Sequence, residues 1–92
     1  MAIERRTVHF RGHVQGVGFR YTTCQVASRF CVSGTVGNLS NGSVRLIAEA
    51  DAAELDRFIS AIQTEMAGRI RDTASESSNP LGDFDGFSIA HY

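Results

Sequence analysis

The 92-residue sequence predicts a small α+β fold in which two helices cover one face of an antiparallel sheet. The prediction depends on hydrophobic periodicity, which is two residues in several short segments and three to four residues in two longer ones. These segments follow one another in the order βαββαβ, with a weak additional element before the last strand. A hydrophobic fraction of 42% in so short a chain suffices for one core, so we expect a single domain over residues 1–92.

The first strand and the first helix are predicted in residues 6–30. In RTVHFRGHV, residues 6–14, Val8 and Phe10 share one face and polar side chains occupy the other, which indicates a strand. Residues 19–30 have apolar side chains at intervals of three and four, the pattern of a helix with one buried side. Its apolar stripe comprises Phe19, Thr23, Val26, Ala27 and Phe30.

A hairpin and a second helix follow. Residues 32–38 and 42–50 have the composition of two strands, and Asn41-Gly42 between them is a strong hairpin signal. Residues 51–66 predict the second helix, with Asp51 as its cap and Glu54 at the spacing of a capping box. The apolar stripe of this helix comprises Leu55, Phe58, Ile59, Ile62 and Met66.

The remainder of the chain predicts weaker elements. Residues 69–75 suggest a short edge strand, and the polar residues 75–83 with the only proline suggest a loop. Residues 86–92 alternate again and predict the last strand, with Phe87 and Ile89 facing the same way. The order of these elements corresponds to the ferredoxin-like α/β sandwich.

Charge and composition exclude several classes of function. The net charge of −1 argues against general affinity for nucleic acid, and the apolar runs are too short to cross a membrane. The N-terminus lacks the apolar region of a secretory signal, so the expected location is cytoplasmic. All nine basic residues are arginines, which excludes chemistry at a lysine. Cys24 and Cys31 are expected to be buried or half-buried free thiols, and no spacing of Cys and His predicts a metal site.

The stretch between the first strand and the first helix is rich in glycine and precedes an arginine. Gly12, Gly16 and Gly18 allow the backbone to curl closely around an anion, and Arg20 lies in the first helical turn. Residues 1–31 carry five arginines against one acid, so the region is locally positive. From the residues alone, a phosphate-binding loop and a glycine-rich packing turn are both open interpretations.

Two motifs resemble those of a known family. GHVQGVGFR, residues 12–20, is similar to the acylphosphatase signature G-x-V-Q-G-V-x-F-R, and GTVGNLSNGSV, residues 34–44, is similar to the second signature of that family. The spacing of the motifs and the ending FSIAHY also match. The resemblance implies a ferredoxin-like enzyme that hydrolyses the carboxyl–phosphate bond of acyl phosphates without a metal or a cofactor.

The resemblance also implies roles for individual residues. Backbone N–H groups of the loop would bind the phosphate, Arg20 would anchor it by charge, and Asn38 would position the attacking water. The side chain of Gln15 is expected only to orient the loop. The implied phosphate-binding residues are Gln15, Gly16, Val17, Gly18, Phe19 and Arg20.

The chain departs from the family pattern at three positions. The second motif commonly has a tryptophan where this chain has Thr35 and a basic residue where it has Gly37. These differences concern the acyl end of the substrate. The family often has an arginine before the last tyrosine, where this chain has His91, a difference that bears on stability.

Alternative functions remain on the same scaffold. One is a non-catalytic module that binds phosphate or another small anion, and another is the acylphosphatase-like domain of a carbamoyl-transfer maturation factor. The presence of both Arg20 and Asn38 favours an enzyme over the first, and the free-standing length and initiator Met favour it over the second. A protein that binds RNA on the face of its sheet is less consistent with this sequence, because the central strands lack interleaved aromatic and basic residues.

We expect the protein to be a monomer that acts on a small-molecule substrate. We also expect His9 and His13 to lie at the surface.

Overall fold

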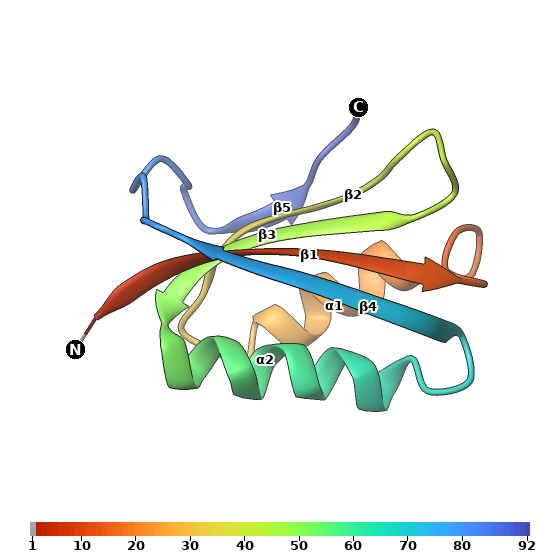
Figure 1. Ribbon diagram of the computed structural model, residues 1–92, viewed down its shortest axis with the longest axis horizontal. Coiled ribbons are helices and arrows are strands. Elements are labelled where there is room, and N and C mark those ends of the chain that lie inside the picture. Colours follow the sequence, from red (N-terminus) through yellow and green to blue (C-terminus); the bar gives the residue numbers. More distant parts are fainter. Residues whose placement is uncertain (1) are drawn as a thin grey trace.

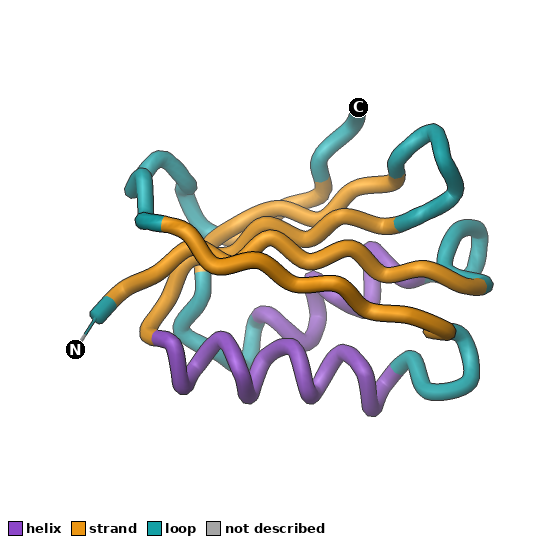
Figure 2. The backbone as a smooth tube through the Cα atoms, in the orientation of Figure 1, coloured by secondary structure: helices purple, strands orange, loops and turns teal. Residues whose placement is uncertain are grey.

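The computed structural model describes residues 2–92 and has two layers, a sheet and a pair of helices (Figure 1). Figure 2 shows both helices on the same side of the sheet, which we call the helix face, and the opposite side is the outer face. The elements in chain order are β1 (Ile3–Gly12), α1 (Phe19–Ala27), β2 (Ser33–Asn38), β3 (Val44–Asp51), α2 (Ala52–Glu65), β4 (Ile70–Ser78) and β5 (Phe87–Ile89).

The sheet has the strand order β4-β1-β3-β2-β5. Its first four strands pair antiparallel, whereas β5 pairs parallel with β2 from Gly34 opposite Phe87 to Val36 opposite Ile89. The predicted ferredoxin-like arrangement, with two helices on one face of an antiparallel sheet, is confirmed for β1 to β4, and β5 adds a parallel edge strand to that sheet. The chain crosses from β4 at one edge to β5 at the other, and this crossover gives β5 the same direction as β2.

The strand that completes the βαββαβ order is β4 rather than the C-terminal segment. It runs over Ile70–Ser78 and therefore includes part of the predicted 75–83 loop, while β5 keeps only three residues of the predicted 86–92 strand. β4 lies at the edge and most of its side chains are exposed, so it carries no alternating apolar pattern. Backbone pairing with β1, from Arg5 opposite Ser78 to Gly12 opposite Ile70, stabilises it instead.

The core lies between the helix face and the two helices. Val8 and Phe10 of β1 are fully buried there, as the period of two predicts. The apolar stripe of α2 is buried from Leu55 to Met66, and that of α1 is buried from Phe19 to Ala27. α1 ends at Ala27, before Phe30, whose ring lies 5.8 Å from that of Phe58.

The predicted capping box of α2 is not formed. Asp51 occupies the N-cap position, but its side chain makes no cap hydrogen bond. The carboxylate of Glu54 instead accepts hydrogen bonds from the Cys31 N–H at 2.9 Å and from Arg57. Glu54 therefore ties α2 to the segment between α1 and β2, a long-range contact that the local spacing could not reveal.

The outer face carries a buried ion cluster that the sequence analysis did not identify. Glu49 of β3 is only 6% exposed, because the segment 79–86 crosses over it. Its carboxylate accepts hydrogen bonds from Arg5 Nε at 2.8 Å and from the N–H groups of Leu81 and Gly82 at 2.8 and 3.0 Å. Arg5 also pairs with Asp83 at 2.8 Å. We call Glu49, Arg5 and these two amides the Glu49 cluster.

Both cysteines are free, but only one fits the expected burial. Cys24 is half-buried, and burial raises the pKa of its thiol. Cys31 is exposed, so the prediction of burial was wrong for this residue, which follows the end of α1. Within residues 2–92, no helix has the length and apolar character needed to cross a membrane.

Candidate active site

The loop between β1 and α1 presents a row of free backbone donors. Gly16 and Gly18 have φ angles of 74° and 78°, whereas Val17 between them has a negative φ. Alternation of this kind turns successive N–H groups toward one point, the arrangement of an anion-binding nest. None of the amides of residues 15–20 donates a hydrogen bond to an acceptor within residues 2–92. The loop therefore has the donors of an anion site and no internal acceptor.

Arg20 adds charge at the same place. It follows Phe19, the first residue of α1, and Gly18 occupies the N-cap position. The first turn has no acidic residue, and no carboxylate in residues 2–92 lies within 4 Å of the Arg20 guanidinium. A cation here lies beside the positive end of the helix dipole, which is unfavourable unless an anion is shared between them. The charge distribution therefore favours an anionic ligand.

Asn38 lies at the end of β2 and faces the loop from the sheet. Strand side chains alternate between the two faces of a sheet, so Asn38 lies on the same face as Val36, two residues earlier in β2. Val36 is fully buried on the helix face, and the Asn38 side chain therefore points to that face as well. The oxygen Oδ1 of Asn38 is buried and accepts no hydrogen bond from the described part of the chain. An unpaired buried polar atom costs about 1–3 kcal/mol, so its retention indicates a partner outside the protein.

Gln15 joins the loop to the hairpin that carries Asn38. Its Nε2 donates to the carbonyl oxygens of Leu39 at 2.8 Å and Ser43 at 2.9 Å. These are the residues that close the β2–β3 turn, since the Leu39 N–H donates to the same Ser43 oxygen. The Nε2 group of Gln15 thus joins the two motifs through two hydrogen bonds, in accordance with an orienting role.

The loop, Arg20 and Asn38 line one hollow of about 250 Å³. Of the sequence-predicted residues, Gly16, Gly18 and Phe19 lie here together with these two, whereas Gln15 and Val17 do not line it. The hollow is smaller than the roughly 300–1,000 Å³ of pockets for drug-sized ligands, so it suits a small molecule. Its other lining residues, which the sequence analysis did not select, are Val14, Tyr21, Ile89 and His91.

A signal for two of the missed residues was present in the sequence. Phe87, Ile89 and His91 have a period of two, which places all three on one side of the last strand. Phe87 packs against the core with its ring 5.6 Å from that of Phe58, so the two later side chains point to the same side of the sheet near the loop.

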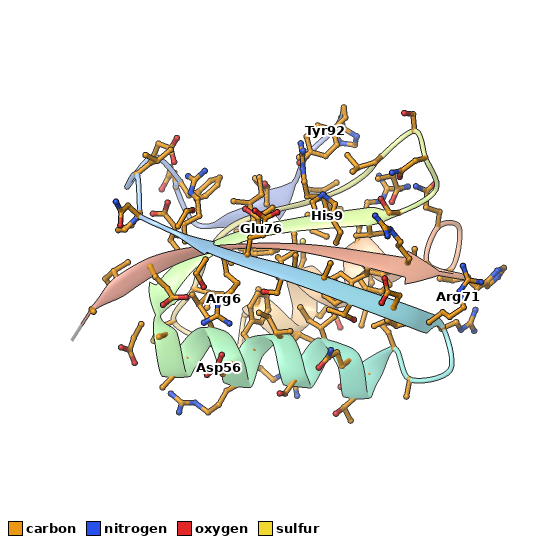
Figure 3. All side chains as sticks on the ribbon, viewed as in Figure 1. Arg6, His9, Asp56, Arg71, Glu76 and Tyr92 are labelled. Carbon is orange, nitrogen blue, oxygen red and sulfur yellow. The ribbon has the colours of Figure 1, made fainter. Side chains whose placement is uncertain are left out.

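His9 and His13 do not line the hollow. His9 lies on the outer face (Figure 3), and His13 is exposed.

The departure at Gly37 has a structural explanation. A Cβ atom at this position would lie 2.5 Å from Cε2 of Tyr92 and 2.6 Å from the Ala90 carbonyl oxygen. Tyr92 lies above the sheet near the C-terminus (Figure 3), and the Arg45 guanidinium is 4.5 Å from the centre of its ring. The C-terminal aromatic residue therefore occupies the space that a larger residue at 37 would need.

A larger hollow elsewhere is less consistent with a binding site. It measures about 650 Å³ and runs along α1 to Glu65. Its principal polar groups are paired with each other, since Arg29 contacts Glu65 at 3.5 Å and Gln25 donates to the Tyr21 hydroxyl at 2.7 Å. Nor does any group of three His, Cys, Asp or Glu side chains within residues 2–92 have the arrangement of a metal site. The free donors at 15–20 remain the stronger candidate.

Comparison with known proteins identifies the family of this chain. The acylphosphatase family model matches residues 6–89. An acylphosphatase of Paenarthrobacter aurescens is 41% identical over 86 residues, which cover 92% of each chain. An acylphosphatase of Listeria welshimeri is 51% identical over 63 residues, or 68% of each chain.

A solved structure of an acylphosphatase also matches this chain over most of its length. The crystal structure of acylphosphatase from Bacillus subtilis superposes with a TM-score of 0.86 at 30% identity, covering 95% of this chain and 98% of that one. These matches confirm the resemblance of the two sequence motifs. With a family model over residues 6–89 and relatives that match over most of their length, the chain belongs to the acylphosphatase family.

Proposed function

We propose that this acylphosphatase binds the phosphate of its substrate with the backbone N–H groups of residues 15–20 and the Arg20 guanidinium. The observation that carries the proposal is the row of free amides beside an arginine that has no carboxylate within 4 Å in residues 2–92. A guanidinium can contact two phosphate oxygens at once, which a single ammonium cannot do. The phosphate would complete the hydrogen bonding of the loop.

We further propose that Asn38 positions the attacking water. Its buried Oδ1 is free to accept a hydrogen bond, and it lines the same hollow as Arg20. A water that donates to this oxygen would lie between the end of β2 and the bound phosphate. Asn38 is neutral, so its contribution is positioning rather than proton abstraction.

The reaction requires little else from the protein. Water attacks phosphorus, the bond from phosphorus to the carboxyl oxygen breaks, and the electron pair leaves with the carboxylate. A carboxylate is a good leaving group, so no strong general acid is needed. Positioning and electrostatic stabilisation suffice for such a phosphoryl transfer. The products are a carboxylate and orthophosphate, and we propose that no metal takes part.

The test is hydrolysis of benzoyl phosphate by the purified protein, with and without a chelator. We expect Arg20→Ala and Asn38→Ala each to lower kcat/KM by roughly 10²–10³, because each removes a contact to the reacting groups. Arg20→Lys should also be severely impaired. Arg29→Ala and Asn79→Ala are matched controls at exposed positions that do not line the hollow, and they should retain activity.

Two results would contradict the proposal. One is wild-type turnover in both Arg20→Ala and Asn38→Ala, and the other is loss of activity on addition of the chelator. Binding of phosphate without any turnover would instead favour the non-catalytic anion-binding module. The comparisons do not favour that alternative, since the matching relatives are acylphosphatases.

The unit that acts is proposed to be the monomer of residues 1–92, in the cytoplasm and without a nucleic-acid partner. Ultracentrifugation of the active protein would test the monomeric state.

A further inference from the structure

A histidine that the proposed function does not use lines the hollow of the candidate active site. His91 shares this lining with Arg20, Asn38 and the two loop glycines Gly16 and Gly18. The hollow measures only about 250 Å³, so an anion bound in it lies close to the side chains of its lining. Among the residue types in the lining, only histidine changes its charge between about pH 5 and pH 8.

The backbone on both sides of His91 is held in place. The Ala90 N–H donates to the Val36 carbonyl oxygen at 2.8 Å, which continues the pairing of β5 with β2 beyond Ile89. The Tyr92 ring lies on the outer face (Figure 3), with the Arg45 guanidinium 4.5 Å from its centre. Side chains alternate along an extended segment, so the residue between these two anchored neighbours points to the helix face, where the hollow lies.

The surroundings of His91 contain no internal partner for a protonated imidazole. Neither ring nitrogen forms a hydrogen bond or an ion pair with another residue in 2–92. The lining has no Asp or Glu, and its other titratable side chains are Arg20 and Tyr21, both on α1. The α-carboxylate of Tyr92 forms no ion pair in the part of the chain that the structure describes.

Two cations in one hollow favour an anion between them. Protonated His91 and Arg20 repel each other when the hollow holds no anion, and a bound dianion reverses the sign of that interaction. An imidazolium also donates from both ring nitrogens, whereas the neutral ring has a single N–H and no charge. Protonation of His91 and binding of an anion should therefore strengthen each other, because such coupling is reciprocal.

We propose that protonated His91 is a second cationic partner of the bound phosphate, so that the affinity of the hollow for a dianion rises as pH falls. This inference rests on the proposed function, because it places the phosphate in the hollow that Arg20 lines. His91 supplies charge and a hydrogen bond to the phosphate oxygens. It takes no proton from the attacking water, which Asn38 positions.

The experiment measures binding of sulfate by calorimetry between about pH 5 and pH 8, the range in which an imidazole changes charge. Sulfate has the shape of phosphate and keeps the same charge over this range, so a change in affinity reports on the protein. We expect the affinity of the unaltered protein to fall about tenfold across the range, through loss of one charge-assisted contact. His91→Gln should bind weakly at every pH, and His91→Arg should bind tightly at every pH.

His9→Gln is the matched control, because His9 lies on the outer face and outside the hollow. It should keep the pH dependence of the unaltered protein. The same pH dependence in His91→Gln, or a constant affinity in the unaltered protein, would overturn the inference and leave the proposed function intact. Absence of sulfate binding at every pH, or binding that Arg20→Ala does not weaken, would instead contradict the proposed function, and the inference with it.

Discussion

The molecule contains two arrangements of backbone amides with an arginine, and only one of them holds an anion of its own. In the Glu49 cluster, two amides and Arg5 surround a buried carboxylate. At residues 15–20, the amides and Arg20 face a hollow with no carboxylate in its lining. Figure 1 shows the two regions toward opposite ends of the sheet, with the segment 79–86 at the left and the 13–18 loop at the right.

The difference between them separates a structural site from a ligand site. Burial alone would raise the pKa of Glu49, but the hydrogen bonds from Leu81, Arg5 and Gly82 outweigh it and hold that pKa below the ordinary value. The anion therefore stays charged and fastens segment 79–86 to the outer face. The same groups without an internal anion form a site for an external one, which is the role we propose for residues 15–20.

Removing the carboxylate of the Glu49 cluster should lower the free energy of unfolding more than any other change predicted here. Glu49→Ala removes an acceptor from Arg5 and from two amides that segment 79–86 brings to the outer face. We expect the free energy of unfolding to fall by about 2–3 kcal/mol, from the hydrogen bonds lost by charged groups. For a chain of this size that corresponds to a decrease in Tm of about 10–20 °C. Urea denaturation measures the change.

The control for this variant is Glu76→Ala, which removes an exposed carboxylate on β4 (Figure 3). It should change stability by less than about 0.5 kcal/mol. Folded Glu49→Ala should still hydrolyse benzoyl phosphate at the normal rate, because Glu49 does not line the hollow. Equal stability of the two variants would mean that the cluster does not stabilise the fold.

Separating the loop from the hairpin should have a moderate effect on stability and a clear effect on activity. Gln15→Ala removes the two hydrogen bonds to Leu39 and Ser43 that join the 15–20 loop to the end of β2. We expect a loss of about 1–2 kcal/mol in stability. Turnover should fall by about tenfold, since small misplacements of catalytic groups are costly.

Gln63→Ala is the matched control for Gln15→Ala, because the Gln63 side chain makes a long, exposed hydrogen bond of 3.4 Å to Thr73. It should leave both stability and turnover unchanged. If Gln15→Ala kept full turnover, the proposed coupling between the loop and Asn38 would be incorrect.

The smallest expected effect is on the pH dependence of stability, compared between Glu49→Gln and the unaltered protein at acid pH. The folded-state pKa of Glu49 lies below its unfolded value, so its contribution is complete above the ordinary glutamate pKa of 4.5 and is lost as pH falls through the folded pKa. The stability of Glu49→Gln should consequently fall less steeply below pH 4.5 than that of the unaltered protein. Urea midpoints from pH 6 to pH 3 measure the two slopes.

Some acid dependence should remain in Glu49→Gln. Hydrogen bonds from Arg6 and from the Cys31 N–H lower the pKa values of Glu4 and Glu54. The stability contributed by these carboxylates is lost in the same direction on acidification. Identical slopes for the variant and the unaltered protein would contradict the role assigned to Glu49.

The sequence predicted the parts of the fold that local patterns encode. The alternation of Val8 and Phe10, the apolar stripes of the helices and Asn41-Gly42 each depend on neighbours within a few residues. The full length of β4 was missed because an exposed edge strand needs no apolar period. The parallel direction of β5 and the burial of Glu49 depend on where segment 79–86 crosses the sheet, which no local pattern specifies.

The candidate site was predictable to a similar degree. The glycine spacing and Arg20 identified the loop from chemistry, whereas Asn38 came from the resemblance to acylphosphatases. Ile89 was assigned to a strand face but not to the hollow, because the pairing of β5 with β2 brings it there. Only the structure shows that Asn38 keeps a buried oxygen unpaired beside the loop.

The central claim is that residues 15–20 bind the phosphate, and amide NMR during a titration with inorganic phosphate tests it most directly. We expect saturable shifts of the amides of residues 15–20, with Leu81 and Gly82 unaffected because Glu49 already occupies their N–H groups. The same titration of Arg20→Ala should show much weaker binding. Largest shifts at any other segment, or unchanged affinity in Arg20→Ala, would contradict the account.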